Sequence, residues 1–241
     1  MKSRRGAPER SGGAPVIEKE LFIMIVYSYF SGEYVNVAES LRRQPEGKRN
    51  FYVNLTNKCT CSCTFCLRSL KHMREDSSLW LKKEPTVAEV EEQLAALPWD
   101  KTGEIVFCGF GEPTCRLEDL KTLMKYVKDN HPDVKTRLNS NGLSDLEYGR
   151  DTAPDFAGIL DTMSISLNAS NAERYYALTR SQFGLKSYDA MLDFAVRCKK
   201  YVPNVVMTVV DHVEDSEEIK KCQKICDDRG LTLRVRVYED K

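Results

Sequence analysis

The sequence predicts an α/β protein whose main part is an open, partial (β/α)6 barrel preceded by a β-hairpin. Strand-like and helix-like segments alternate from residue 51 onward, which is typical of parallel βαβ units. The strand-like segments also alternate apolar with polar residues, whereas a closed eight-stranded barrel fills its interior with bulky apolar side chains. A six-stranded sheet with one polar face therefore favours an open barrel that lines a ligand site.

The residues before the barrel fall into two predicted parts. Residues 1–20 are expected to form a disordered tail, because positions 1–15 are rich in Gly, Pro, Arg and Ser and offer little apolar surface to bury. Residues 21–50 are expected to form a β-hairpin and a polar loop, with 21–30 as the first strand and a turn at Ser31-Gly32. Residues 51–241 then make up the core domain.

Six parallel strands are expected in the core domain. Their segments are 51–56, 104–109, 134–140, 162–168, 204–210 and 231–238. In the first, Asn54 and Thr56 alternate with Val53 and Leu55. Because successive side chains of a strand point to opposite faces, the apolar face is expected to pack against helices. The polar face is expected to line something wet or liganded.

Helical patterns fall between the strands. Thr86 and Glu89 form a predicted capping box, and Pro98 ends that helix. Two further patterns cover 117–128 and 187–201. The last helix is expected to begin at Asp215 and to end at Gly230.

The composition excludes some function classes. Lys plus Arg and Asp plus Glu both number 36, so the chain shows no strong nucleic-acid signal. The longest apolar run, 21–30, is too short to cross a membrane. Nine cysteines are an odd number for a disulfide framework and favour free thiols in a reducing compartment. The protein is therefore expected to be cytoplasmic.

Four cysteines lie within eight residues directly after the first barrel strand. They can be read as Cys59-x3-Cys63-x2-Cys66, with Cys61 spare. Thiolates favour zinc or an iron–sulfur cluster. A structural zinc site needs four ligands, commonly two separated pairs, and the sequence shows no clean second pair. The spacing thus favours a cluster, with zinc as the alternative.

Four motifs in order along the chain resemble those of radical S-adenosylmethionine (SAM) enzymes. "CTCSCTFC" resembles their CxxxCx-aromatic-C signature, "GFGEP" at 109–113 their GGE-type motif, "NSNG" at 139–142 their NTNG variant, and "SISLN" at 164–168 their ribose-binding strand. That family has a partial (β/α)6 barrel, in agreement with the expected polar face. More narrowly, residues 51–241 resemble the small radical SAM proteins that are associated with TatD-type nucleases.

The resemblance implies an enzyme that cleaves SAM reductively to a 5′-deoxyadenosyl radical, which abstracts hydrogen from an unidentified substrate. Cys59, Cys63 and Cys66 would hold a [4Fe–4S] cluster as its metal site. A flavodoxin or ferredoxin would supply the electron, and a TatD-type nuclease is an implied functional partner. The residues implied in SAM binding are Phe65, Gly109, Phe110, Gly111, Glu112, Pro113, Asn139, Ser164, Ser166 and Asn168.

Three alternatives stay open. Within enzymes these are a 7-carboxy-7-deazaguanine-synthase-like lyase and a glycyl-radical activase. From another class, a zinc-stabilised, non-catalytic module acting beside a nuclease would use the same cysteines. Metal content separates the classes, because a [4Fe–4S] cluster contains iron and inorganic sulfide and a structural site contains zinc.

Further side chains are substrate candidates. Arg137, Arg234 and Arg236 are expected on the polar face and need anionic partners there. Those partners are protein carboxylates, such as Glu104 or Glu112, or an anionic substrate or the SAM carboxylate. His212 ends the fifth strand and is a further substrate candidate.

The other cysteines have simpler expectations. Cys108 and Cys115 bracket GFGEP, and Cys222 and Cys226 lie four residues apart on the last helix. All four are expected in the core, since free cysteine behaves as a small hydrophobe. Cys61 is expected either to face solvent or to serve as an alternative ligand in a damaged cluster.

Overall fold

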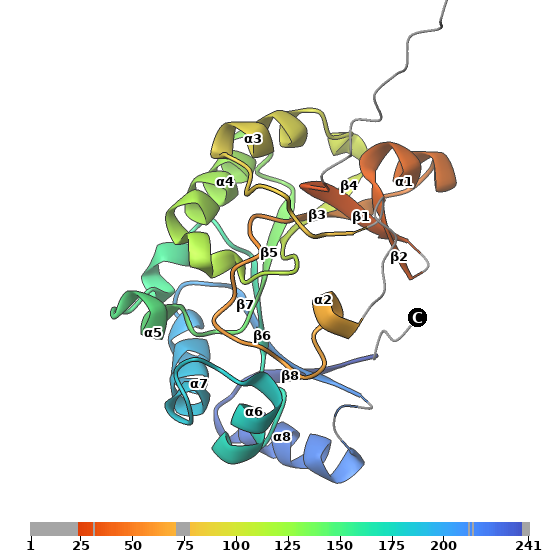
Figure 1. Ribbon diagram of the computed structural model, residues 1–241. Coiled ribbons are helices and arrows are strands. Elements are labelled where there is room, and N and C mark those ends of the chain that lie inside the picture. The colour runs from red at the N-terminus through yellow and green to blue at the C-terminus, as the bar shows by residue number, and fades with distance from the viewer. Residues whose placement is uncertain (1–23, 31, 71–77, 212, 214, 238–241) are drawn as a thin grey trace, which may run out of the picture.

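The computed structural model describes residues 24–30, 32–70, 78–211, 213 and 215–237. Within them one sheet has the strand order β2-β1-β3-β4-β5-β6-β7-β8 (Figure 1). The strands are β1 Val26–Phe30, β2 Glu33–Asn36, β3 Arg49–Val53, β4 Thr102–Phe107, β5 Lys135–Ser140, β6 Thr162–Ser166, β7 Asn204–Val210 and β8 Thr232–Arg236. Strands β3 to β8 pair in parallel, and β2 and β8 form the two edges, so the sheet is not closed. The open barrel of six parallel strands is confirmed.

The hairpin is also confirmed for the residues that the structure describes. Strands β1 and β2 pair antiparallel, and β1 pairs antiparallel with β3 through Val26 with Val53 and Tyr27 with Tyr52. The hairpin therefore extends the parallel sheet beyond β3. The residues before Met24, including the predicted tail, lie outside the described part. The domain boundaries after residues 20 and 50 stay predictions.

Helices occupy most of the segments between strands. They are α1 Val37–Arg43, α2 Leu67–Leu70, α3 Val87–Ala95, α4 Leu117–Asn130, α5 Ser144–Tyr148, α6 Ala172–Thr179, α7 Lys186–Cys198 and α8 Ser216–Asp228, with short 3-10 helices at Trp99–Lys101, Pro113–Arg116 and Ala153–Phe156. In the part of the chain that the structure describes, no helix combines the length and apolar character needed to cross a membrane.

The strongest helix prediction is confirmed in detail. Thr86 Oγ1 accepts from Glu89 N at 3.2 Å, and Glu89 Oε2 accepts from Thr86 N at 2.7 Å, which is the predicted capping box. Helix α1 was not predicted. The hairpin's second strand ends at Asn36, whose side chain accepts from Glu39 N at 2.8 Å and starts this helix. A capping side chain thus converts the end of the strand into a helix start.

The sheet has two chemically different faces, as the sequence predicts. Helices α3, α4, α7 and α8 lie on the outer face (Figure 1). Apolar strand residues are buried there: Phe51, Ile105, Leu138, Met163 and Met207. The opposite face, called the polar face below, carries the alternate residues, with Val106, Val206 and Val210 as apolar exceptions. The packing of the outer face leaves the polar face for ligands.

Asp161 fastens the amino end of β6 to β5. Its carboxylate accepts from Thr136 N at 2.8 Å, from Lys135 Nζ at 3.1 Å and from Lys128 Nζ. Burial alone would raise the pKa of Asp161, but the bonds from Lys128, Thr136 and Lys135 outweigh it and lower the pKa to about 2. The negative charge of Asp161 therefore stabilises the fold.

We expect Asp161→Asn to lower the free energy of unfolding at pH 7 by about 1 kcal/mol, after allowance for solvent screening. The native carboxyl has a pKa below its ordinary value of 3.8, so its contribution is complete above about pH 5 and is lost as pH falls towards 2. Urea unfolding at pH 7 and pH 3 would measure both effects, and the difference between variant and native protein should shrink at pH 3. Asp129→Asn, at an exposed i,i+4 pair, is the control and should cost less than about 0.5 kcal/mol.

Candidate cofactor site

The cysteine loop runs from the end of β3, past α6, to α2 (Figure 1). Backbone hydrogen bonds attach it to the last turn of α6. Ser62 N donates to Thr179 O at 2.9 Å and Thr64 N donates to Leu178 O at 2.9 Å, while Thr60 O accepts from the turn that follows α6. The loop is thus held at three points, Thr60, Ser62 and Thr64, before its last cysteine. This attachment places the cysteines at the carboxyl end of the sheet, where parallel α/β barrels carry their sites.

The four thiols differ in exposure. Cys59, Cys63 and Cys66 are partly exposed, whereas Cys61 is buried with 4% of its surface accessible. Cys61 N donates to Cys59 Sγ at 3.4 Å, and Asn141 Nδ2 donates to Cys61 Sγ at 3.8 Å. The expectation that Cys61 faces solvent is wrong, because its side chain packs into the apolar core.

The pKa values of Cys59 and Cys61 show that the loop on its own does not favour thiolates. A hydrogen bond with Cys61, followed by burial, raises the pKa of Cys59 well above its usual value. For Cys61, the bond with Cys59 lowers the pKa, but contact with Cys63 and burial raise it to about 12. These thiols therefore stay protonated unless a cation binds, since a coordinating metal removes the thiol proton.

The donor set fits an iron–sulfur cluster. Such clusters are held by cysteine thiolates, and three of the partly exposed thiols come from one loop in the spacing Cys59-x3-Cys63-x2-Cys66. Each thiolate of a four-iron cluster binds a different iron, so the sulfur atoms need not converge on one point. Among the described residues, no three His, Cys, Asp or Glu side chains surround a point that a single metal ion could occupy.

The GFGEP segment packs directly on the chain that leads into the cysteine loop. A Cβ atom at Gly109 would lie 2.0 Å from Asn54 Oδ1, and one at Gly111 would lie 2.3 Å from Thr56 O and 2.5 Å from Lys58 O. Glu112 N donates to Lys58 O at 2.7 Å. Gly111 is therefore required by the backbone, because no other residue permits such close backbone approach, whereas Gly109 leaves room for the Asn54 side chain.

The Glu112 side chain joins GFGEP to the segment after β5. Its carboxylate, 5% exposed, accepts from Ser140 Oγ at 2.9 Å, from Asn141 N at 2.7 Å, and from Thr114 N at 3.2 Å and Thr114 Oγ1 at 2.8 Å. Burial raises the pKa of Glu112, against the effect of these bonds. Glu112 makes no ion pair with an arginine within the described residues, so it is not the arginine partner that the sequence suggested. Pro113 is buried and starts the 3-10 helix that follows.

Asn141 completes the contact between the loops, and the sequence analysis missed it. Its Nδ2 donates to Thr60 Oγ1 at 2.9 Å on the cysteine loop, and its backbone N donates to Glu112. Asn139, which was predicted, lies on the polar face of β5, and its Oδ1 is buried without a hydrogen-bond partner. The only signal in the sequence for Asn141 was its place in the NSNG motif.

The predicted ribose-binding strand lies on the polar face. Ser164 Oγ accepts from Arg234 Nη2 at 3.1 Å, and Ser166 is partly buried on the same face. Asn168 is buried with φ of +61°, a left-handed conformation that asparagine tolerates better than most residues. Phe65 is partly buried on the cysteine loop, whereas Phe110 packs against a small apolar cluster of Met24, Tyr27 and Leu79.

The remaining cysteines divide into two groups. Cys222 and Cys226 are fully buried in the core, as predicted. The same prediction is wrong for Cys108, whose Sγ lies 3.5 Å from Tyr27 Oη at the hairpin and belongs to neither apolar cluster. It is also wrong for Cys115, which is partly exposed. Burial, Glu112 and Cys59 together raise the pKa of Cys115 to about 12.

The predicted substrate arginines are only partly paired. Arg137 Nη2 lies 2.9 Å from Glu104 Oε2, so the carboxylate partner suggested from the sequence is confirmed for this arginine. Within the described residues, neither Arg234 nor Arg236 has a carboxylate at ion-pair distance. His212 lies outside the described residues.

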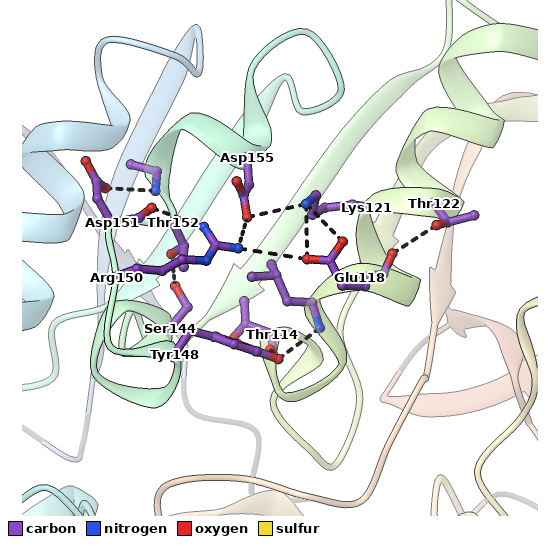
Figure 2. Close-up of polar contacts among 12 residues, drawn as sticks. Thr114, Glu118, Lys121, Thr122, Ser144, Tyr148, Arg150, Asp151, Thr152 and Asp155 are labelled. Carbon is purple, nitrogen blue, oxygen red and sulfur yellow. Dashed lines mark hydrogen bonds and ion pairs between the residues drawn. The ribbon is translucent and has the colours of Figure 1, made fainter.

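A network of polar contacts supports the site from the helical side (Figure 2). Tyr148 Oη donates to Thr114 O at 2.9 Å, beside GFGEP. Asp155 lies between Arg150, at 2.6 Å, and Lys121, at 3.5 Å, and so ties the segment after α5 to α4. These contacts give residues 149–155 a structural role.

An open parallel barrel with a cysteine loop after its first barrel strand defines the class: an α/β enzyme that carries a cofactor at the carboxyl ends of its strands. The sequence matches the radical SAM superfamily over residues 53–224, and the chain belongs to that superfamily. Its members are enzymes that bind a [4Fe–4S] cluster and SAM.

Known proteins agree with this assignment. A GTP 3′,8-cyclase of Corynebacterium glutamicum (strain R) is 31% identical over 196 residues, which cover 77% of this chain and 48% of that protein. The chain thus spans about half the length of that curated relative. The structure of Streptococcus suis SuiB bound to S-adenosylmethionine has a TM-score of 0.60 at 16% identity, covering 84% of this chain and 44% of that one. TYW1 with a lysine-pyruvate adduct has a TM-score of 0.58 at 16% identity, covering 88% and 77%. The structural likeness shows the shared fold.

We expect Gly111→Ala to disrupt the site, because a Cβ there would overlap two backbone carbonyl oxygens. The free energy of unfolding should fall by about 2–3 kcal/mol, and iron uptake on reconstitution should fall with it. Gly158→Ala is the control: its φ is +74° but its Cβ would meet open space, so it should cost about 1 kcal/mol and leave iron uptake unchanged. Equal iron uptake in both variants would contradict the proposed packing.

We expect Glu112→Gln to lower the free energy of unfolding by about 2 kcal/mol. The carboxylate accepts from Asn141 N and Ser140 Oγ on its two oxygens, and an amide would leave one buried donor without an acceptor. Thermal unfolding together with chemical denaturation would measure the loss. Glu118→Gln, at an exposed carboxylate of α4, is the matched control, and a similar loss there would show that Glu112 has no special role.

Proposed function

We propose that this chain reductively cleaves SAM at a [4Fe–4S] cluster held by Cys59, Cys63 and Cys66, and that the resulting 5′-deoxyadenosyl radical abstracts hydrogen from a substrate. The observation that carries the proposal is the cysteine loop, which is attached to α6 at the carboxyl end of a superfamily barrel. When bound, the cluster and SAM would supply the radical chemistry. The protein would supply orientation and protection from water.

The chain's own residues would bind and orient SAM. Asn139 Oδ1 is buried and lacks a partner, so it is available to a donor such as a ribose hydroxyl or the amino group of SAM. Ser164, Ser166 and Asn168 lie on or directly after the neighbouring strand and would contact the ribose or the carboxylate. Glu112 and Asn141 would act as positioning residues, because both are engaged in holding the three loops together.

The reaction beyond hydrogen abstraction is left open. The Corynebacterium relative is named for a reaction of GTP, but this chain covers only 48% of that protein. A one-electron donor such as flavodoxin or ferredoxin would reduce the cluster. The functional link to a TatD-type nuclease, the cytoplasmic location and the alternative lyase, activase and zinc-module functions stay predictions.

The proposal predicts 5′-deoxyadenosine from an anaerobically reconstituted and reduced protein in the presence of SAM. Native protein should contain about four irons per chain with inorganic sulfide. Cys66→Ala should contain less iron and should form no 5′-deoxyadenosine. Cys226→Ala, at a buried thiol of α8, is the matched control and should retain both properties.

Metal content and product together test the proposal. One zinc per chain in place of iron would overturn it in favour of the zinc-stabilised module. Equal product from native protein and Cys66→Ala would also contradict it, because cleavage would then not depend on the proposed ligand. Product that requires Cys66, together with iron and sulfide, would support the radical chemistry.

A further inference from the structure

The polar face carries an excess of positive charge. Arg137 on β5 and Arg234 and Arg236 on β8, called the arginine group below, all project from this face, as the strand register and alternation require. Glu104 pairs with Arg137 at 2.9 Å, and it is the single carboxylate of the described residues at ion-pair distance from the group. Three positive charges therefore share one negative partner.

Within the described residues the arginine group lacks full counter-charge, although the Arg234 side chain is exposed and Arg236 is partly exposed. Burial, then Arg137 and Arg236, lowers the pKa of Arg234, while Glu104 and Tyr52 act in the opposite direction. Arg234 donates to the uncharged Ser164 Oγ at 3.1 Å, which does not neutralise it. Arg137 Nε is buried without any acceptor. An unpaired donor and like charges destabilise a protein, and an anion would relieve both.

Aromatic side chains lie next to the arginine group. Tyr27 and Tyr52 stack with ring centroids 5.3 Å apart at 22°, and Tyr34 meets Tyr27 edge-on at 5.5 Å. These three tyrosines, called the tyrosine wall below, come from the hairpin and β3. Tyr27 is almost fully buried, whereas Tyr34 and Tyr52 are partly exposed.

The sheet register brings the two groups together. Tyr52 is paired with Val106, and Val106 with Arg137, so the tyrosine and the arginine lie in one row two strands apart. Their backbones are therefore two strand spacings, about 10 Å, apart, and both side chains project from the polar face. Arg234 extends from β8 across the same face, since its Nη2 lies 3.1 Å from Ser164 Oγ on β6.

We propose that the substrate site recognises a planar aromatic molecule that carries a carboxylate or a phosphate, with its oxyanion on the arginine group and its ring against the exposed edge of the tyrosine wall. The proposal rests on the proposed function for the reaction, but the binding it describes does not require cluster chemistry. Arginine pairs bind both kinds of oxyanion through parallel N–H groups, and tyrosine offers a rigid apolar face.

The test is calorimetric titration of the reconstituted, unreduced protein with phenyl phosphate and benzoate. Methyl phosphate keeps the anion without the ring, and benzyl alcohol keeps the ring without the anion. We expect either phenyl phosphate or benzoate to bind at least tenfold more tightly than methyl phosphate and benzyl alcohol. The difference in affinity between phenyl phosphate and benzoate identifies which oxyanion is preferred. Equal affinity for methyl phosphate would overturn the aromatic part of the proposal, and equal affinity for benzyl alcohol would overturn the anionic part.

Variants locate the binding. Arg234→Gln and Arg236→Gln should each weaken binding of the preferred anion about tenfold, since each removes a charged donor. Tyr52→Leu should weaken it several-fold, while Tyr52→Phe keeps the ring and should restore most of the affinity. Arg229→Gln, at the surface end of α8, is the matched control and should bind like the native protein. Native-like affinity in both β8 variants would overturn the proposal.

Stability distinguishes a binding role from a structural one. Because the arginines repel one another, Arg236→Gln should leave the melting temperature unchanged or raise it in the absence of anion. A clear fall would show that Arg236 supports the fold, which contradicts the proposal. Titration in the presence of saturating SAM provides the last arm: displacement of the aromatic anion by SAM would assign the arginines to the SAM carboxylate and overturn the substrate assignment.

The result is separable from the proposed function. Arginine-dependent binding by a protein that forms no 5′-deoxyadenosine would leave this site standing and reject the radical chemistry. Formation of 5′-deoxyadenosine without arginine-dependent binding would do the reverse.

Discussion

The buried carboxylate of Glu112 is the interaction on which the candidate site depends. Its two oxygens take hydrogen bonds from Ser140, Asn141 and Thr114, and its backbone N–H binds the chain just before Cys59. One residue thus connects the ends of β3, β4 and β5. A buried acceptor with several partners fixes geometry firmly, because breaking any one bond would leave a polar group without water. The cysteine loop inherits its position from this residue and from its bonds to α6.

Much of the fold could be predicted because the alternation of polar and apolar residues along each strand indicates which face is buried. The alternation of Asn54 and Thr56 with Val53 and Leu55 is local information, and it implied the open sheet that the structure has. The capping box at Thr86 is equally local. Helix α1 escaped prediction because residues 33–37 continue a strand pattern up to the first residue of the helix, and only the Asn36 cap decides where the helix starts.

The site was harder to predict where partners come from distant segments. Asn141 follows its strand by one residue. Its role becomes visible only from its hydrogen bond to Thr60, which lies 81 positions earlier in the chain. Cys108 looked like a core cysteine because nothing near it in the sequence reveals Tyr27 across the sheet. Glu104 and Glu112 were equal candidates for the ion pair with Arg137. The structure pairs Arg137 with Glu104, because the Glu112 carboxylate is bound to the segment after β5. Pairings of this kind are properties of the folded sheet, not of any segment.

The close packing of GFGEP against the chain that follows β3 also limits which substitutions this protein can accept over evolutionary time. The space beside Gly109 is filled by the Asn54 side chain, and the space beside Gly111 by two backbone carbonyl groups. A larger residue at position 109 thus becomes tolerable only if position 54 shrinks at the same time, whereas position 111 has no such exchange available. Among diverging descendants of this sequence, positions 54 and 109 should therefore vary as a pair, and position 111 should hardly vary at all.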